Sequence, residues 1–232
     1  MKRSLLLIPA LAAAALVPAP SASARVVELG LPADPVTPSC PTDPCEAAVR
    51  VTGYQGRSAG GRKNPYYIRR DGRIVAFTVT LADLTDEQIG FFNTNFGSPA
   101  QARLSVLRKG DTRRTRLQHR LVQQSDMFRL DRYFGSSPTF VLDEALRVKK
   151  GNWIAITVPT WAPIFANNLP GANWWRSSRP RGSCDTPESL GQFAMQELRE
   201  INVFGCTYSG ARLLYTVTYI PDNRETVDGE GD

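Results

Sequence analysis

The chain has 232 residues and a formal net charge of +6, from 28 basic and 22 acidic residues. This length is enough for one sizeable hydrophobic core, so the fold need not depend on metals or on a dense set of disulfides. A single histidine excludes metal sites built from several histidines, and we expect no metal site and no cofactor.

Residues 1–24 have the pattern of a secretory signal peptide. Lys2 and Arg3 precede an apolar run that is too short to span a bilayer, and the Ala-Ser-Ala at 22–24 matches a signal-peptidase site. We expect cleavage after Ala24, a secreted extracellular chain, and no membrane insertion after cleavage. The mature chain would hold 26 basic and 22 acidic residues, a net charge of +4.

The mature chain predicts one domain between two irregular ends. Residues 25–46 are rich in proline and predict an extended lead-in, whereas residues 222–232 predict a flexible acidic tail. From residue 47 to 221, apolar residues recur with period two and no linker or internal repeat interrupts them. We expect about nine strands there, at residues 47–54, 73–81, two in a hairpin within 102–122, 127–134, 138–142, 146–158, 192–195 and 211–220.

One helix is expected, at residues 85–96, because Thr85 can act as its N-cap and acidic residues follow in the first turn. So many strands and turn signals make the fold class all-β. The most economical architecture is a two-sheet antiparallel sandwich, jelly-roll-like, with one short helix and long loops.

Four cysteines in an exported chain predict two disulfides, with three possible pairings. Their spacing favours Cys40 with Cys45, which enclose Pro-Thr-Asp-Pro, and Cys184 with Cys206, which would clip a long excursion to a late strand. The alternative, a four-thiolate zinc site, fits poorly because no CxxC occurs.

The four tryptophans all fall between residues 153 and 175. Pro159 and Pro163 predict that strand pairing ends near Trp161, since proline donates no ladder hydrogen bond. A Pro/Gly/Asn-rich loop then carries the next two tryptophans among arginines. Aromatic faces stack on sugars and arginine bonds polar groups, so a rim is the candidate ligand site, made of Trp161, Trp174, Trp175, Arg176 and Arg179. The alternative is that these rings pack as a lid on the sandwich.

No residues form a recognisable catalytic set. His119 lies in a basic strand with no carboxylate to orient it, so we expect an exposed strand residue. A glycosidase needs two carboxylates across a sugar, and the candidate pairs are Asp126 with Asp131, Asp143 with Glu144, and Glu197 with Glu200. Basic stretches at 62–73 and 103–120 are interpreted as solvated strand faces, and no nucleic-acid partner is expected.

Three segments resemble a group of secreted β-sandwich proteins from high-GC Gram-positive bacteria, to which no function is assigned. They are VKKGNWIAITVPTWAP (148–163), NWWRSSRPRGSC (173–184) and CTYSGARLLY (206–215). The resemblance implies an exported β-sandwich with a Cys184–Cys206 link, and it implies no activity and no ligand residues.

The favoured function is a secreted, non-catalytic β-sandwich that binds a glycan or other cell-surface polymer through the Trp/Arg-rich rim. One alternative is a polysaccharide hydrolase or lyase with a carboxylate pair. The other is a structural or interaction protein that takes no small ligand.

Overall fold

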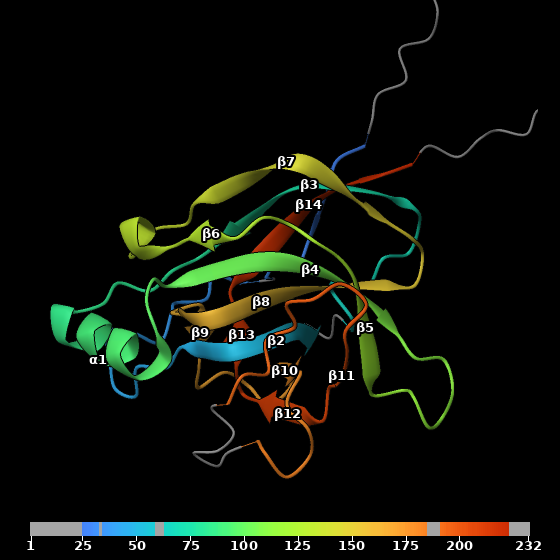
Figure 1. Ribbon diagram of the computed structural model, residues 1–232. Helices are drawn as coiled ribbons and strands as arrows, with labels where there is room; N and C mark the ends of the chain where they lie inside the picture. The colour runs from blue at the N-terminus through green and yellow to red at the C-terminus, as the bar shows by residue number, and fades with distance from the viewer. Residues whose placement is uncertain (1–24, 33, 59–62, 185–190, 223–232) are drawn as a thin grey trace, which may run out of the picture.

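The computed structural model describes residues 25–32, 34–58, 63–184 and 191–222. Two large antiparallel sheets lie face to face, and the one α-helix of the described residues lies at one end of the larger sheet (Figure 1). The predicted all-β sandwich with one short helix is confirmed. The predicted signal peptide, residues 1–24, and nearly all of the predicted tail lie outside the described residues.

The two sheets are built from strands that are distant in sequence. In the described part of the chain the smaller sheet has four strands, in the order β1 (Val27–Leu29), β14 (Tyr215–Pro221), β3 (Gly72–Val79) and β7 (Thr139–Val148). The larger sheet has the order β11 (Ile201–Val203), β5 (Gln118–Gln124), β4 (Gln101–Lys109), β8 (Asn152–Ala162), β2 (Ala48–Arg57), β10 (Trp174–Ser177) and β12 (Cys206–Ser209). Short elements complete the fold, namely β6 (Phe128–Arg129) on β4, a 3-10 turn (Asp131–Tyr133), and the pair β9 (Phe165–Ala166) and β13 (Arg212–Leu213).

The main hydrophobic core lies between the two sheets. Ile154, Ile156 and Val158 of β8 belong to it, together with Phe77 of β3 and Val217 of β14, and each is at most 1% exposed. Alternate residues of a strand point to opposite faces of its sheet, so the period-two pattern of the sequence produces this inward row. The predicted period-two recurrence of apolar residues is therefore confirmed for β8.

The outer face of the larger sheet carries a second, smaller core. It contains Tyr54, Leu107, Leu121, Trp153, Ala155, Met195 and Phe204. The segment 191–204 lies over these residues, where the Met195 N–H donates to Thr52 Oγ1 over 2.9 Å and the Phe193 N–H donates to the Arg50 carbonyl over 2.9 Å. The strand predicted at 192–195 is wrong, since Phe193 forms only an isolated bridge to Val51. Residues 192–195 cover the outer face of the sheet instead of extending it, and the segment joins the sheet only at β11, which pairs with β5.

The expected strand end at residue 158 is wrong, because β8 runs past Pro159 to Ala162. Pairing with β2 persists to Ala162, and the register shifts between Val49 and Val51, where Arg50 adopts a positive φ of 44°. Pro159 lies opposite this irregularity. A bulge leaves local backbone groups out of the ladder, which lets a strand in the middle of a sheet hold a proline.

The helix α1 (Asp86–Phe96) forms where the sequence predicts it. Thr85 Oγ1 accepts from the Gln88 N–H over 3.3 Å, and the Gln88 side chain accepts from the Thr85 N–H over 3.1 Å, which completes a capping box. Asp86 and Glu87 lie in the first turn, where their negative charges interact favourably with the positive end of the helix dipole.

Removal of this cap should have a measurable and limited cost. Thr85→Ala is expected to lower the free energy of unfolding by about 1 kcal/mol, because one N-terminal donor loses its acceptor. Thr94→Ala, an exposed substitution on the same helix, is the matched control and should change it by less than about 0.5 kcal/mol. Equal losses in chemical denaturation would show that the cap contributes nothing specific.

Both predicted disulfides are present, Cys40–Cys45 and Cys184–Cys206. Such bonds are compatible with an extracellular protein. The second joins the loop after β10 to the start of β12, so it holds the outermost strand pair of the larger sheet. No helix among the described residues has the length and apolar character needed to cross a bilayer.

Candidate functional site

The five predicted ligand residues lie in three separate places. Trp161 is fully buried beneath α1, where its ring stacks on Phe92 with centroids 4.8 Å apart. Its Nε1–H donates to Asn93 Oδ1 over 3.1 Å. The expectation of an exposed rim is therefore wrong for Trp161, because β8 continues and α1 packs over its end.

Strand β10 separates the adjacent tryptophans. Trp175 belongs to the main core at 4% exposure and stacks on Tyr208, with ring centroids 4.5 Å apart. Trp174 is half-buried with its ring over Gly56, and the Arg176 guanidinium lies 5.6 Å from the centroid of that ring. Successive residues of a strand point to opposite faces, so these two rings cannot bind one ligand together.

Arg179 is buried at the edge of the larger sheet and holds the neighbouring groups in place. It is 7% exposed, and its Nη2–H donates to the Val49 carbonyl over 2.9 Å while Nη1–H donates to Tyr208 Oη over 3.2 Å. The Tyr208 hydroxyl in turn donates to the Cys184 carbonyl over 2.9 Å. Arg179 therefore orients the Tyr208 ring that stacks on Trp175.

A groove with an aromatic lining lies between α1 and the β10–β12 edge of the larger sheet. We call it the aromatic groove, and its rings are Phe91, Phe92, Phe96, Phe165, Trp175 and Tyr208. Its volume is about 880 Å³, which falls in the range of small-molecule sites. Phe91 is 57% exposed and forms its most open ring.

Polar groups form the rim of the aromatic groove. Asn167 Nδ2 donates to Glu46 Oε2 over 2.7 Å, which holds the amide against the groove wall. Asn167 Oδ1 is buried and has no hydrogen-bond partner among the described residues. A buried acceptor without a partner costs about 1–3 kcal/mol, so a ligand hydroxyl that donated to it would recover that loss.

Sequence reasoning found two residues of the groove, Trp175 and Arg179, and missed the rest. The helix contributes three phenylalanines, and a Phe-Phe pair on a short amphipathic helix was a usable signal because one of the two must face outward. Tyr208 follows two residues after Cys206, so the predicted Cys184–Cys206 link already placed it beside the 173–184 loop.

The residues of the candidate carboxylate pairs lie in two kinds of environment, local hydrogen bonds and a polar pocket. Asp131 Oδ1 accepts from the Ala100 N–H over 3.2 Å, and Glu200 Oε2 accepts from the N–H groups of Gln196 and Glu197, so both serve local structure. Asp126, Asp143 and Glu144 line a polar pocket of about 610 Å³ beside β7.

His119 is fully buried in the second core, which corrects the expectation of an exposed strand residue. Its Nε2 lies 3.2 Å from Tyr54 Oη and its Nδ1 lies 3.2 Å from the Leu117 carbonyl. Burial lowers the pKa of His119 to about 4; the bond to Leu117 opposes this shift, and Lys109 and Arg176 add to it. The segment 191–204, which supplies Phe204 to the ring cluster, causes the burial.

Among known proteins no family model, curated protein or solved structure matches this chain. The resemblance to secreted proteins of high-GC Gram-positive bacteria therefore stays a prediction.

Proposed function

We propose that the chain is a secreted, non-catalytic binding protein that holds a glycan of a cell-surface polymer in the aromatic groove. The signal-peptide pattern of residues 1–24 and the two disulfides support export. The groove replaces the rim predicted from sequence as the binding surface, and it keeps Trp175 and Arg179 as the residues that build its wall.

The observation that carries the proposal is the combination of an exposed ring and an amide oxygen without a partner in one groove. Phe91 presents an open aromatic face, and the Asn167 amide oxygen in the groove wall has no donor among the residues that the structure describes. A sugar ring offers an apolar face for stacking and hydroxyl groups for hydrogen bonds, so it matches both. Glu46 and Asn168 on the same rim add further acceptors and donors.

The test is binding of the mature chain to a glycan array and to insoluble cell-wall polysaccharide. The double variant Phe91→Ala/Asn167→Ala removes the open ring and the amide oxygen that has no partner. We expect about a tenfold to hundredfold loss of affinity, since stacking and a hydrogen bond together account for about 1.4–2.8 kcal/mol.

Leu198→Ala/Asn202→Ala is the matched control. Leu198 has the same 57% exposure as Phe91, and Asn202 Nδ2 donates to Glu200 Oε1 over 3.0 Å much as Asn167 donates to Glu46. This pair lies outside the aromatic groove and should leave affinity unchanged. Equal losses in both variants, or no glycan bound by the wild type, would refute the groove assignment.

The same samples distinguish a binding protein from an enzyme. Reducing sugar released from the bound polysaccharide, and lost in Asp143→Asn/Glu144→Gln, would overturn the non-catalytic assignment in favour of the pocket beside β7. Unchanged polysaccharide is the expected result.

A further inference from the structure

The β4–β5 hairpin carries an amount of charge equal to that of the whole chain. Residues 101–124 hold seven basic side chains and one acidic side chain, a net charge of +6, and the formal net charge of all 232 residues is also +6. The remaining residues therefore sum to zero. Six of the seven cations lie within residues 108–120, at the end of the hairpin away from α1 (Figure 1).

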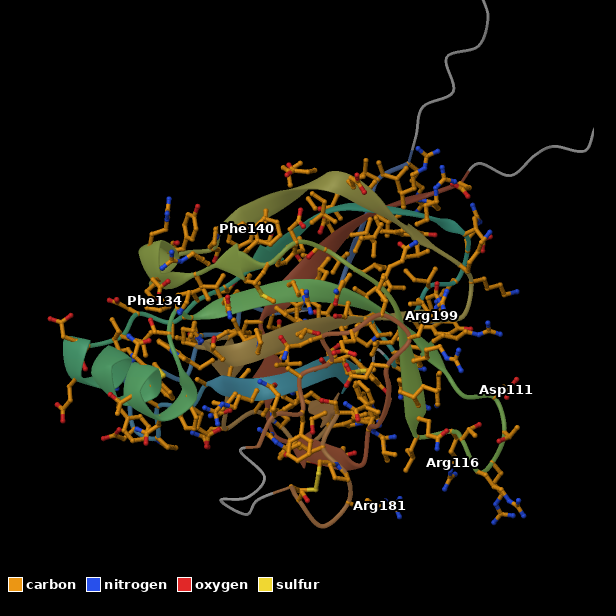
Figure 2. All side chains as sticks on the ribbon, viewed as in Figure 1. Asp111, Arg116, Phe134, Phe140, Arg181 and Arg199 are labelled. Carbon is orange, nitrogen blue, oxygen red and sulfur yellow. A yellow bond between two sulfur atoms is a disulfide. The ribbon has the colours of Figure 1, made fainter. Side chains whose placement is uncertain are left out.

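These cations have little acidic compensation. The two ion pairs among the described residues are Arg129–Asp131 and Lys149–Asp71, and neither involves the hairpin. Figure 2 shows Asp111, the one acid of the hairpin, on the same projecting loop as Arg116. Burial lowers the pKa of Lys109, and the charges of Arg176 and Arg116 add to that shift, so like charges repel one another at this end of the sheet.

Arg108 and Arg120 are placed to hold one anion between them. They are directly opposite in the register of β4 and β5, and both are exposed. With Lys109 they line a hollow of about 560 Å³ at the base of the loop, where three cations face one acid, Asp111. Like charges directly opposite on neighbouring strands are destabilising, and an anion between them removes the repulsion.

The side-chain chemistry favours phosphate over carboxylate. A guanidinium presents N–H donors in one plane, and a single guanidinium can donate to both oxygens of a carboxylate. A tetrahedral phosphate offers oxygens in more than one plane, so two opposed guanidinium groups can bind it at once. The further cations of the loop, Arg113, Arg114 and Arg116, are all exposed and extend the surface beyond one phosphate.

We propose that the β4–β5 hairpin binds a linear phosphate-bearing polymer and holds one of its phosphates between Arg108 and Arg120. The site is distinct from the aromatic groove, since α1 lies at the other end of the larger sheet (Figure 1). It does not depend on the proposed function, although a wall polymer that contains both sugars and phosphates would use both surfaces.

The experiment measures binding of the mature chain to linear inorganic polyphosphate at several salt concentrations. Arg108→Gln/Arg120→Gln should weaken binding about tenfold and reduce the slope of log K against log salt by about two, because two charge contacts are lost. Poly-L-glutamate should bind at least about tenfold more weakly than polyphosphate at equal charge.

The matched control is Arg73→Gln/Arg147→Gln. These arginines are also exposed and directly opposite, on β3 and β7, and their removal changes the net charge by the same amount. Binding of this control should stay within about twofold of the wild type. Equal losses in the two double variants would overturn the site in favour of net charge alone, and equal affinity for poly-L-glutamate would overturn the preference for phosphate.

Two further measurements distinguish a phosphate polymer from a phospholipid surface, and the hairpin proposal from the groove proposal. Tighter binding to phosphatidylglycerol vesicles than to polyphosphate would overturn the polymer in favour of a lipid surface. The groove variant Phe91→Ala/Asn167→Ala should bind polyphosphate as the wild type does. If the groove variant binds glycans as the wild type does, only the groove proposal is refuted. If the hairpin variant binds polyphosphate as the wild type does, only the hairpin proposal is refuted.

Discussion

Trp161→Ala is expected to lower the free energy of unfolding by about 3–5 kcal/mol, the usual cost of deleting a large buried aromatic side chain. The Trp161 ring is fully buried and lies in ring contact with Phe92 and Phe134. Its indole N–H also donates to Asn93 of α1, so the substitution leaves a cavity and an unpaired amide beneath the helix. Urea denaturation followed by near-ultraviolet circular dichroism measures the loss.

Two further variants identify its source. Trp161→Phe keeps a ring against Phe92 and removes the N–H donor, and it should cost less than the alanine variant by at least about 1 kcal/mol. Trp174→Ala removes a half-buried ring outside the main core and should cost about 1–2 kcal/mol. If Trp161→Ala and Trp174→Ala lower the free energy of unfolding equally, the contacts of Trp161 with α1 contribute nothing specific to stability.

Sequence pattern was sufficient wherever one element determines its own structure. The helix at 85–96 was predictable because Thr85 and Gln88 satisfy its first N–H groups locally. The inward row Ile154, Ile156 and Val158 follows from the pleat alone. Proline in β8 was misleading, because the bulge that accommodates Pro159 depends on Arg50 of a partner strand about a hundred residues away in the sequence.

The candidate site was harder to predict because distant segments build it. The helix, β9, β10 and β12 meet at the aromatic groove only after both sheets have formed. The sequence grouped Trp174 with Trp175 because they are adjacent, whereas β10 is a strand and sends their rings to opposite faces. Composition predicted tryptophan and arginine as ligand residues, and it could not show which of them the core retains.

The burial of His119 also depends on a segment that is distant in sequence, and its consequence for stability is larger. A basic strand predicts a solvated histidine, yet the segment 191–204 covers the outer face of the larger sheet and places Phe204 4.3 Å from the imidazole centroid. With the proton on Nδ1, the ring donates to the Leu117 carbonyl and accepts from Tyr54 Oη at Nε2. The charged groups nearby, Lys109 of β4 and Arg176 of β10, both oppose protonation.

The protein should therefore lose stability in mild acid through His119. Its pKa falls from 6.5 in the unfolded chain to about 4 in the folded protein, so between these values the unfolded state binds a proton that the folded state does not. Stability from this residue is complete above pH 6.5, declines as the pH falls, and levels off below pH 4. A shift of this size corresponds to a loss of about 3 kcal/mol.

His119→Gln isolates this contribution, because glutamine can accept from Tyr54 and does not titrate. The free energy of unfolding, measured at pH 7 and pH 4, should fall by about 3 kcal/mol more in the wild type than in the variant. The carboxylates contribute equally to both proteins and cancel in the comparison. Asp71, whose pKa is lowered by hydrogen bonds from the Lys150 backbone and the Lys149 side chain, loses its contribution only below its ordinary value of 3.8. An identical pH dependence in the two proteins would mean that the second core opens before His119 takes up its proton, and the cover formed by residues 191–204 would then be only marginally stable.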